Sequence, residues 1–346
     1  MKLSIVDQSP VSSGSTPAEA LHNTIELARL ADRLGYERYW IAEHHAIDSF
    51  ASPAPEVLIA RVAAETSAIR VGAGGILLPH YSPLKVAEVF RMLHALHPGR
   101  IDLGLGRAPG GTARETYALR RDRGERIHAH AHADDFTEQL TELLAFLYSD
   151  FPANHPFAKI KVTPAMPGVP PVWLLGSSPW SASAAAHFGL PYAFAHFIDP
   201  EPTRPAVESY RLQFKPSRYL SAPRAIVALG VLCADTEQEA QRLLGSARLF
   251  RRRIQQGIAG PIPSLEEAER ELGPYQAPVR MEASEWPRYV VGAPEQVKGM
   301  LTRMAGDLHL EELMVVTIVH DHQARMRSYE LLAQAFDLAH RLVQEG

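Results

Sequence analysis

Residues 71–111 read VGAGGILLPHYSPLKVAEVFRMLHALHPGRIDLGLGRAPGG and contain a complete strand–helix–strand unit. Residues 71–78 are a short apolar run that predicts a buried strand, and residues 83–97 carry the apolar spacing of a helix. One apolar face of this helix is formed by Val86, Val89, Phe90, Leu93 and Leu96. A Pro-Gly pair ends this helix before a second apolar run at residues 101–105. Two parallel strands need such a crossover, so Arg107 is expected at the carboxyl end of a strand, where α/β folds place their chemistry.

The same alternation continues along the whole chain. Strands are predicted at residues 3–6, 39–42, 71–78, 101–105, 172–175, 192–194, 225–233 and 313–318, each followed by a helical segment. Most of these strands are apolar without alternation, which is typical of a parallel sheet covered on both faces. Eight such units predict a (β/α)8 TIM barrel. An open Rossmann-like sheet is the alternative, and the unbroken pattern to the C-terminus argues against it.

Two longer connections predict insertions after strands 4 and 7 within a single domain that covers residues 1–346. After strand 4, residues 112–148 are expected to be mostly helical, and the proline-rich residues 151–171 form an irregular excursion. After strand 7, residues 257–287 are rich in glycine, proline and charge and show no regular pattern. A structureless loop of that length is typical of a lid, an interface or a disordered segment, and a lid is the candidate here.

Composition narrows the class of protein. The chain has 346 residues, of which 46% are hydrophobic, and a formal net charge of −4, which does not favour a nucleic-acid or membrane partner. Cys233 is its one cysteine and lies in an apolar run, so no disulfide can form within the chain. No signal peptide and no apolar segment near the ~20 residues of a membrane span are present. We therefore expect a soluble, cytoplasmic protein.

Two glycine-containing turns are candidate anion sites. The first holds Arg107 between closely spaced glycines, which let a backbone approach a ligand whose phosphate an arginine can grip; a tight turn with a surface arginine is the alternative. The second turn, Gly176-Ser177-Ser178, precedes Pro179 and starts a helix. The free amides of a helix N-terminus favour an anion, although simple N-capping would also account for Ser178.

A histidine pair follows strand two, and two glycines interrupt strand three. In Glu43-His44-His45 adjacent side chains diverge, so at most one histidine faces the barrel mouth, where it can act as a general base or donor; a capping or core histidine is the alternative. Glycines after Ala73 weaken a strand unless something approaches closely, and a flat ring lying against Ala73, Gly74 and Gly75 would explain them.

No metal site is expected. The sequence lacks an HExxH motif, and the histidines after strand two have no companion at ligand spacing. His128, His130 and His132 could in principle bind a transition metal. Histidines two apart on a helix diverge, however, so this run is interpreted as the solvated start of a helix.

Taken together, these motifs resemble the bacterial luciferase-like, flavin-dependent monooxygenase family, and within it the alkanal-monooxygenase-like branch. The matching segments, in the family's order, are residues 43–45, 71–79, 87–88, 98–107, 176–178 and 291–297. The resemblance implies a TIM barrel that binds reduced FMN, a diffusible co-substrate, at its carboxyl mouth. Residues 257–287 fall where the family has a mobile lid.

The resemblance also assigns roles to residues. His44 matches the catalytic histidine of the family, and Arg107 with Gly176, Ser177 and Ser178 matches its contacts to the flavin phosphate. Strand three of the family often contains a non-proline cis peptide, which would fall here at about Gly74–Gly75. Gly106 stands where light-emitting members carry a reactive cysteine, which argues against light emission.

The activity implied is monooxygenation of a small organic substrate, for which an aldehyde is one candidate. Reduced FMN and O2 would be the co-substrates, with a separate NAD(P)H:flavin reductase as partner. One alternative is a deazaflavin (F420)-dependent hydride-transfer oxidoreductase on the same barrel. Another is a non-catalytic flavin-binding subunit. Family members pair through helices two and three, so a homodimer is expected.

Overall fold

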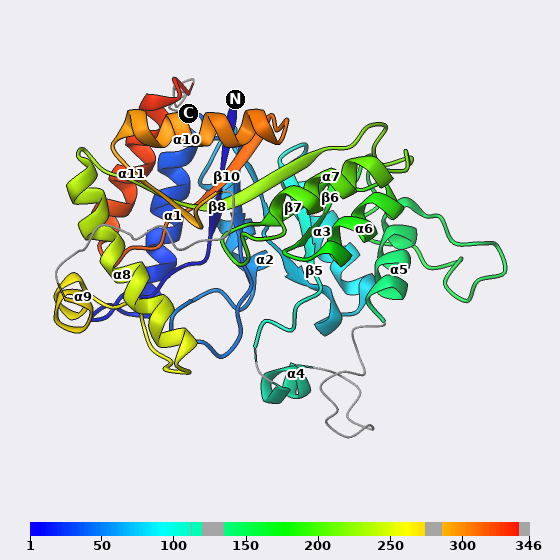
Figure 1. Cartoon of the computed structure of the whole chain (residues 1–346). Coiled ribbons are helices and arrows are strands. Elements are labelled where there is room, and N and C mark those ends of the chain that lie inside the picture. Colours follow the sequence, from blue (N-terminus) through cyan, green and yellow to red (C-terminus); the bar gives the residue numbers. More distant parts are fainter. Residues whose placement is uncertain (112, 120–134, 274–285, 339–346) are drawn as a thin grey trace.

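The computed structural model describes residues 1–111, 113–119, 135–273 and 286–338 and shows a closed parallel barrel with flanking helices (Figure 1). Each strand pairs with the next around the barrel, and the last pairs with the first. The barrel strands are β1 (Lys2–Asp7), β2 (Arg38–Ile41), β3 (Arg70–Ala73), β5 (Ile101–Gly106), β6 (Val172–Gly176), β7 (Tyr192–Ala195), β8 (Ala225–Cys233) and β10 (Glu312–Val316). The prediction of a TIM barrel is confirmed.

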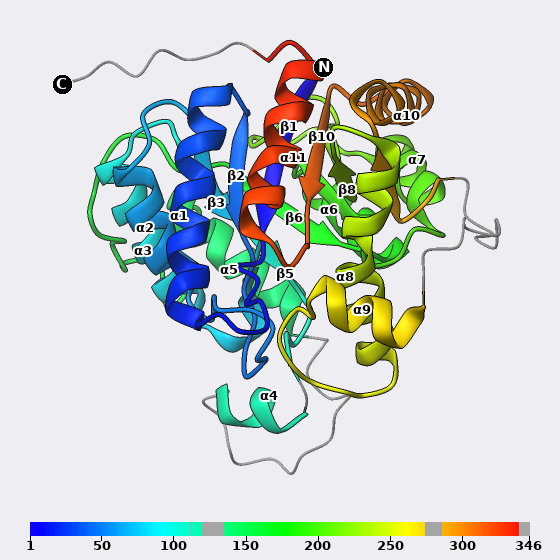
Figure 2. The ribbon, with the colours of Figure 1, turned by 90° about the vertical axis from the view of Figure 1, so that its left-hand side faces the viewer.

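Helices cover the outside of the barrel, as the view turned by 90° shows for α1 and α11 (Figure 2). They are α1 (Pro17–Leu34), α2 (Pro55–Ala64), α3 (Pro83–Leu96), α5 (Phe136–Tyr148), α6 (Pro179–Phe188), α7 (Thr203–Gln213), α8 (Glu237–Gln255), α10 (Pro294–Asp307) and α11 (His322–Ala335). Capping residues in the sequence determine where some of these helices begin and end. In α1, Thr16 forms a capping box with Glu19, Pro17 occupies the first turn, and Gly35 ends the helix in the left-handed conformation.

Strand three departs from the prediction of one continuous strand. The run is divided into β3 and a short β4 (Ile76–Leu77), followed by the 3-10 turn η1 (Leu78–His80). The Gly74–Gly75 peptide is cis, as the resemblance implied. A Cβ atom on Gly75 would lie 2.7 Å from the carbonyl oxygen of Gly104 in β5. Glycine is therefore required here by the close approach of the two strands, whether or not a ligand lies against them.

The insertion after β5 begins with α4 (Ala113–Leu119), which lies apart from the barrel in both ribbon views (Figures 1 and 2). Helix α5 then packs against α3. Residues 151–171 contain no helix or strand, as predicted. His128, His130 and His132 lie outside the described residues.

The insertion after β8 is more ordered than predicted. Within residues 257–287 the structure contains a helix, α9 (Leu265–Leu272), which begins with a capping box between Ser264 and Glu267. Arg253 of α8 binds Glu267 and Glu271, so α9 is held against α8. Residues 274–285 lie outside the described part, and a lid remains a prediction. A further strand, β9 (Tyr289–Gly292), pairs with the end of β8 and was not among the predicted strands.

The core has two layers, one between barrel and helices and one inside the barrel. Buried ion pairs fill the amino end of the barrel. Arg38 in β2 binds Asp102 in β5 at 2.8 Å and Glu312 in β10 at 2.6 Å. Burial alone would raise the pKa of Asp102, but Arg38 and Arg70 hold it below its ordinary value. Since this end is filled, a ligand must enter at the carboxyl end.

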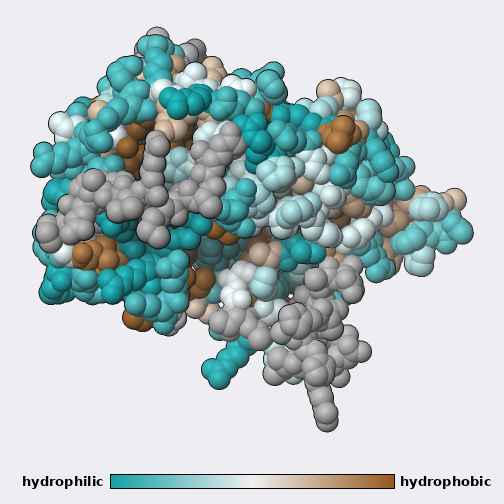
Figure 3. Space-filling view, in the orientation of Figure 1, coloured by the Kyte–Doolittle hydropathy of each residue, from teal (hydrophilic) through white to brown (hydrophobic). Residues whose placement is uncertain are grey.

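In the space-filling view the visible face is mainly hydrophilic, with hydrophobic residues in small separate patches (Figure 3). Among the described helices, none combines the length and the apolar character that crossing a membrane requires.

Candidate functional site

A cavity of about 310 Å³ opens at the carboxyl ends of the barrel strands. This volume lies in the range of pockets that hold small molecules. Residues on or just after all eight barrel strands line it. The lining includes seven predicted site residues, His44, Gly74, Gly75, Arg107, Gly176, Ser177 and Ser178. The structure thus brings together residues up to 134 positions apart, from His44 to Ser178.

Ala73 is the exception among the predicted site residues. Its side chain is fully buried in the core layer between barrel and helices and does not line the cavity. Side chains alternate along a strand, so Ala73 faces outward while Gly72 and Gly74 face inward. Only Gly74 and Gly75 therefore remain as candidate contacts for a flat ring.

His44 lies in the loop that follows β2 and presents an unpaired nitrogen. Its Nε2 atom is buried and makes no hydrogen bond to any described residue. The imidazole lies against Phe50, with ring centroids 4.5 Å apart and an angle of 31° between the planes. Burial, with a smaller contribution from His45, lowers the pKa of His44 to about 4. The imidazole is therefore neutral near pH 7 and can give or accept one proton.

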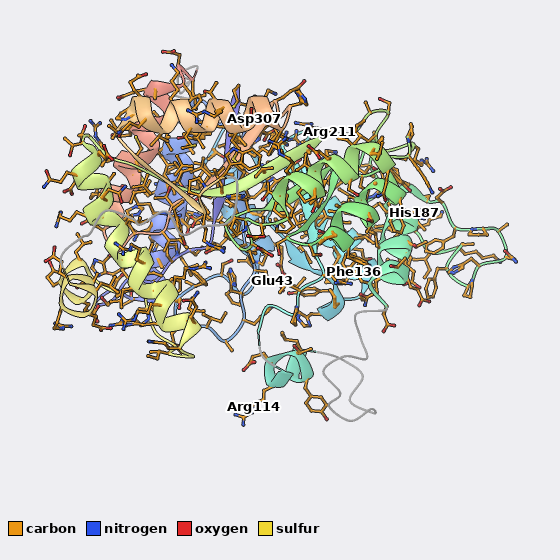
Figure 4. The ribbon with its side chains drawn as sticks, in the orientation of Figure 1. Glu43, Arg114, Phe136, His187, Arg211 and Asp307 are labelled. Atoms are coloured by element: carbon orange, nitrogen blue, oxygen red, sulfur yellow. The ribbon has the colours of Figure 1, made fainter. Side chains whose placement is uncertain are left out.

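His45 is directed to Glu43 instead of the cavity, as the divergence of adjacent side chains predicted. Its Nε2 atom lies 2.6 Å from Oε1 of the buried Glu43, which is labelled near the centre of Figure 4. Glu43 also accepts hydrogen bonds from the Leu77 amide at 2.9 Å and the Tyr81 hydroxyl at 2.7 Å. Burial and then Glu43 raise the pKa of Tyr81, so its phenol stays protonated. Glu43 thus joins the His44 loop to β4 and η1.

Arg107 and the turn before α6 form the polar part of the cavity. Ser178 has the backbone conformation of an N-cap, but its side chain makes no capping hydrogen bond. Neither Ser177 nor Ser178 uses its hydroxyl in a hydrogen bond to a described residue, so capping does not account for them. A Cβ atom on Gly176 would lie 2.5 Å from the Ser181 side chain, which leaves glycine as the residue that fits. The α6 N-terminus, two free hydroxyls and a guanidinium suit a phosphate.

Neither a metal site nor a reactive thiol is apparent within the described residues. No group of three or more His, Cys, Asp or Glu side chains in that part of the chain is placed to hold a metal ion. Cys233 is buried, and burial raises the pKa of its thiol to about 12. The thiolate is therefore absent at physiological pH, which leaves Cys233 as a core residue.

Most residues that line the cavity were not predicted from the sequence as site residues, and Phe50, which supports the site without lining it, was also missed. Trp180 lies in the first turn of α6, Phe50 supports His44, and Gln8 follows β1. For Gln8 a signal was present, because a polar residue directly after a barrel strand lies at the mouth. Phe50 and Trp180 carry no such signal, because their contacts join segments that are distant or irregular.

Comparison with known proteins gives consistent matches over nearly the whole chain. A family model described as luciferase-like monooxygenase matches residues 1–307. A luciferase-like monooxygenase of Escherichia coli (strain K12) is 38% identical over 95% of both chains. The N-acetyl-S-alkylcysteine monooxygenase of Bacillus subtilis (strain 168) is 36% identical over 99% of this chain and 100% of its own. The crystal structure of apo-MsnO8 shares 52% identity and a TM-score of 0.89, covering 98% and 99% of the two chains.

Proposed function

Because the chain belongs to the luciferase-like monooxygenase family, we propose that it is the oxygenase component of a two-component, flavin-dependent monooxygenase. Reduced FMN and O2 are its co-substrates, and a small organic molecule is oxidised. One oxygen atom of O2 enters the substrate and the other leaves as water, with two electrons from the flavin.

One observation carries this proposal: a single cavity combines a site suited to phosphate, a glycine wall suited to a flat ring, and an unpaired histidine nitrogen. Arg107 with Ser177 and Ser178 would hold the FMN phosphate. Gly74 and Gly75 would lie against the ring. His44 Nε2, buried and without a partner in the described structure, would hold or transfer a proton at the reacting oxygen. Reduced flavin supplies the chemistry that activates O2, and the chain supplies orientation and exclusion of water.

The substrate is proposed to be small and largely apolar. Arg107 is the only cationic side chain among the lining residues of the described cavity, and it is assigned to the phosphate. Phe197, Ile198 and Met314 give the remaining wall an apolar character. A relative named as acting on N-acetyl-S-alkylcysteine supports thioethers as a class to test, beside the aldehydes that the family resemblance suggests.

Two partners follow from this proposal. Reduced FMN must be delivered, so a separate NAD(P)H:flavin reductase is expected, with both proteins in the cytoplasm. The chain is also proposed to form a homodimer through α2 and α3. Val57 on α2 and Met92 and Leu96 on α3 are 66%, 54% and 63% exposed, although each is apolar. Leu96 therefore lies on the outer face of α3, although its spacing had placed it on the buried face.

O2 uptake in the presence of NADH, FMN and an added flavin reductase tests the function. A panel of thioethers and aldehydes is added, and oxygen from ¹⁸O2 is traced in the product by mass spectrometry. We expect labelled product with the wild type, and loss of product with normal FMN binding for His44→Ala. Unchanged product formation in His44→Ala would remove the histidine from the mechanism. Anaerobic reduction of a substrate by reduced deazaflavin would replace the proposal with hydride transfer, and flavin binding without turnover of any substrate would indicate an inert subunit.

A further inference from the structure

Arg107 lies over an aromatic ring and has no counter-ion in the described structure. Its guanidinium carbon is 3.9 Å from the centroid of the Trp180 ring. It forms no hydrogen bond or ion pair with any described residue. The guanidinium is half-buried and lines the cavity. An arginine in this setting keeps its donors free for a ligand.

Other arginines in the protein show that this arrangement is unusual. Four further arginines lie over aromatic rings, at 5.0 to 5.3 Å. Each of the four is also paired with a carboxylate: Arg38 with Asp102 and Glu312, Arg204 with Glu208, Arg218 with Asp150, and Arg224 with Glu312. Within the described chain, Arg107 alone among the stacked arginines depends on its ring.

Trp180 is itself held in place. It is the second residue of α6, directly after Pro179 and the N-cap Ser178. Its ring system and the ring of Phe136 of α5 meet edge to face, with centroids 5.6 Å apart and an angle of 77° between the planes. Because two helices support it, the indole is a rigid surface beside the N-terminus of α6.

We propose that Trp180 is a positioning residue, whose indole face holds the Arg107 guanidinium beside the first turn of α6. Arg107, Ser177 and Ser178 then form one pre-arranged site for the phosphate of FMN. This inference rests on the proposed function. A free arginine side chain loses rotamer freedom when it binds a ligand, and stacking removes part of that loss before the ligand arrives. The ring face also attracts the cation directly.

The test measures the affinity of dithionite-reduced FMN under anaerobic conditions and of oxidised FMN by flavin fluorescence. The variants are Trp180→Leu, which keeps apolar contact but has no ring, and Trp180→Phe, which keeps a ring. Arg107→Ala and the double variant Arg107→Ala/Trp180→Leu complete a double-mutant cycle. Riboflavin, which lacks the phosphate, is the matched ligand. Thermal unfolding of each variant reports on its fold.

Trp180→Leu is expected to raise the Kd of FMN about threefold to tenfold, and Trp180→Phe by less than about threefold. The riboflavin Kd should stay unchanged in both, and Trp180→Leu should have no further effect when Arg107 is already alanine. An unchanged FMN Kd in a folded Trp180→Leu variant would overturn the inference, as would an equal loss for riboflavin. If Trp180→Leu does not fold, Trp180→Met, which is also apolar and has no ring, takes its place, and an unchanged FMN Kd in that folded variant would overturn the inference. If Arg107→Ala binds FMN with the wild-type Kd, then Arg107 does not hold the FMN phosphate, and it is this part of the proposed function that is wrong.

Discussion

The neutral state of His44 makes a measurable prediction about stability. Burial, and then the charge of His45, lower the pKa of His44 to about 4, against an ordinary value of 6.5. The ring of Phe50 covers one face of the imidazole, and Nε2 has no described partner that would stabilise a proton. A protonated His44 would therefore be a poorly solvated cation. We expect its imidazole to titrate near pH 4 in the folded protein.

The sign and size of the effect follow from linkage. Because the folded pKa lies below the unfolded pKa, the unfolded chain takes up the proton first as the pH falls. His44 then destabilises the fold progressively between pH 6.5 and pH 4, and has almost no effect above pH 7. With these two pKa values the destabilisation is about 2 kcal/mol at pH 5 and about 0.1 kcal/mol or less at pH 7.5. The full difference, reached below pH 4, is about 3 kcal/mol.

The assay is urea unfolding of the wild type and of His44→Gln at pH 7.5 and pH 5. Glutamine fills a similar volume and does not titrate, so the difference between the proteins isolates the histidine. We expect His44→Gln to gain about 2 kcal/mol relative to the wild type between the two pH values. A Phe50→Ala variant, which uncovers the ring, should raise the pKa of His44 when its imidazole is followed by NMR. A relative stability that does not change with pH, or an imidazole that titrates near 6.5, would refute the reasoning.

Three further predictions concern the barrel and its surface. Asp102→Asn removes the buried carboxylate that pairs with both Arg38 and the partly buried Arg70, while Arg38 keeps its pair with Glu312. We expect a loss of about 3 kcal/mol in urea unfolding. Gly75→Ala places a Cβ atom 2.7 Å from a carbonyl oxygen and should cost about 1–3 kcal/mol. The matched Gly299→Ala in α10 meets nothing within 4 Å and should instead add about 0.5–1 kcal/mol of stability. If the protein dimerises through α3, Leu96→Asp should give monomers in light scattering. The control Leu212→Asp, on the 88% exposed side chain of α7, should not.

The barrel could be predicted from sequence because its strands are buried on both faces. In the sequence each such strand is an apolar run, for example residues 225–233, and turn residues and a segment with helical spacing follow it. The strands that were not predicted correctly are short, or their sequence fits more than one kind of element. Residues 71–78 form one apolar run in which the two glycines indicated a weak point, and only the family resemblance indicated the cis peptide at Gly74–Gly75. Strand β9 has four residues, too few to outweigh the proline that starts α10.

The site was predictable to the extent that it consists of strand ends. Arg107 and Ser177 directly follow β5 and β6, so their place at the mouth follows from the topology. The direction of the Ala73 side chain needed the exact register of β3, which composition does not reveal. The contact between Arg107 and Trp180 spans 73 residues of sequence. Such a pairing depends on how two separate βα units pack, and no local pattern encodes it.

The two ends of the barrel differ in how their polar groups are satisfied, and this difference explains where a ligand can act. At the amino end, Arg38 is fully neutralised by carboxylates, so that end gains nothing from a bound anion. At the carboxyl end, the partner of Arg107 within the described residues is the ring of Trp180, and His44 lies beside the ring of Phe50. A partly buried cation without a counter-ion is costly unless an anion completes it. Aromatic support keeps both groups in place without using their donors, so that the bound ligand, not the protein, satisfies them.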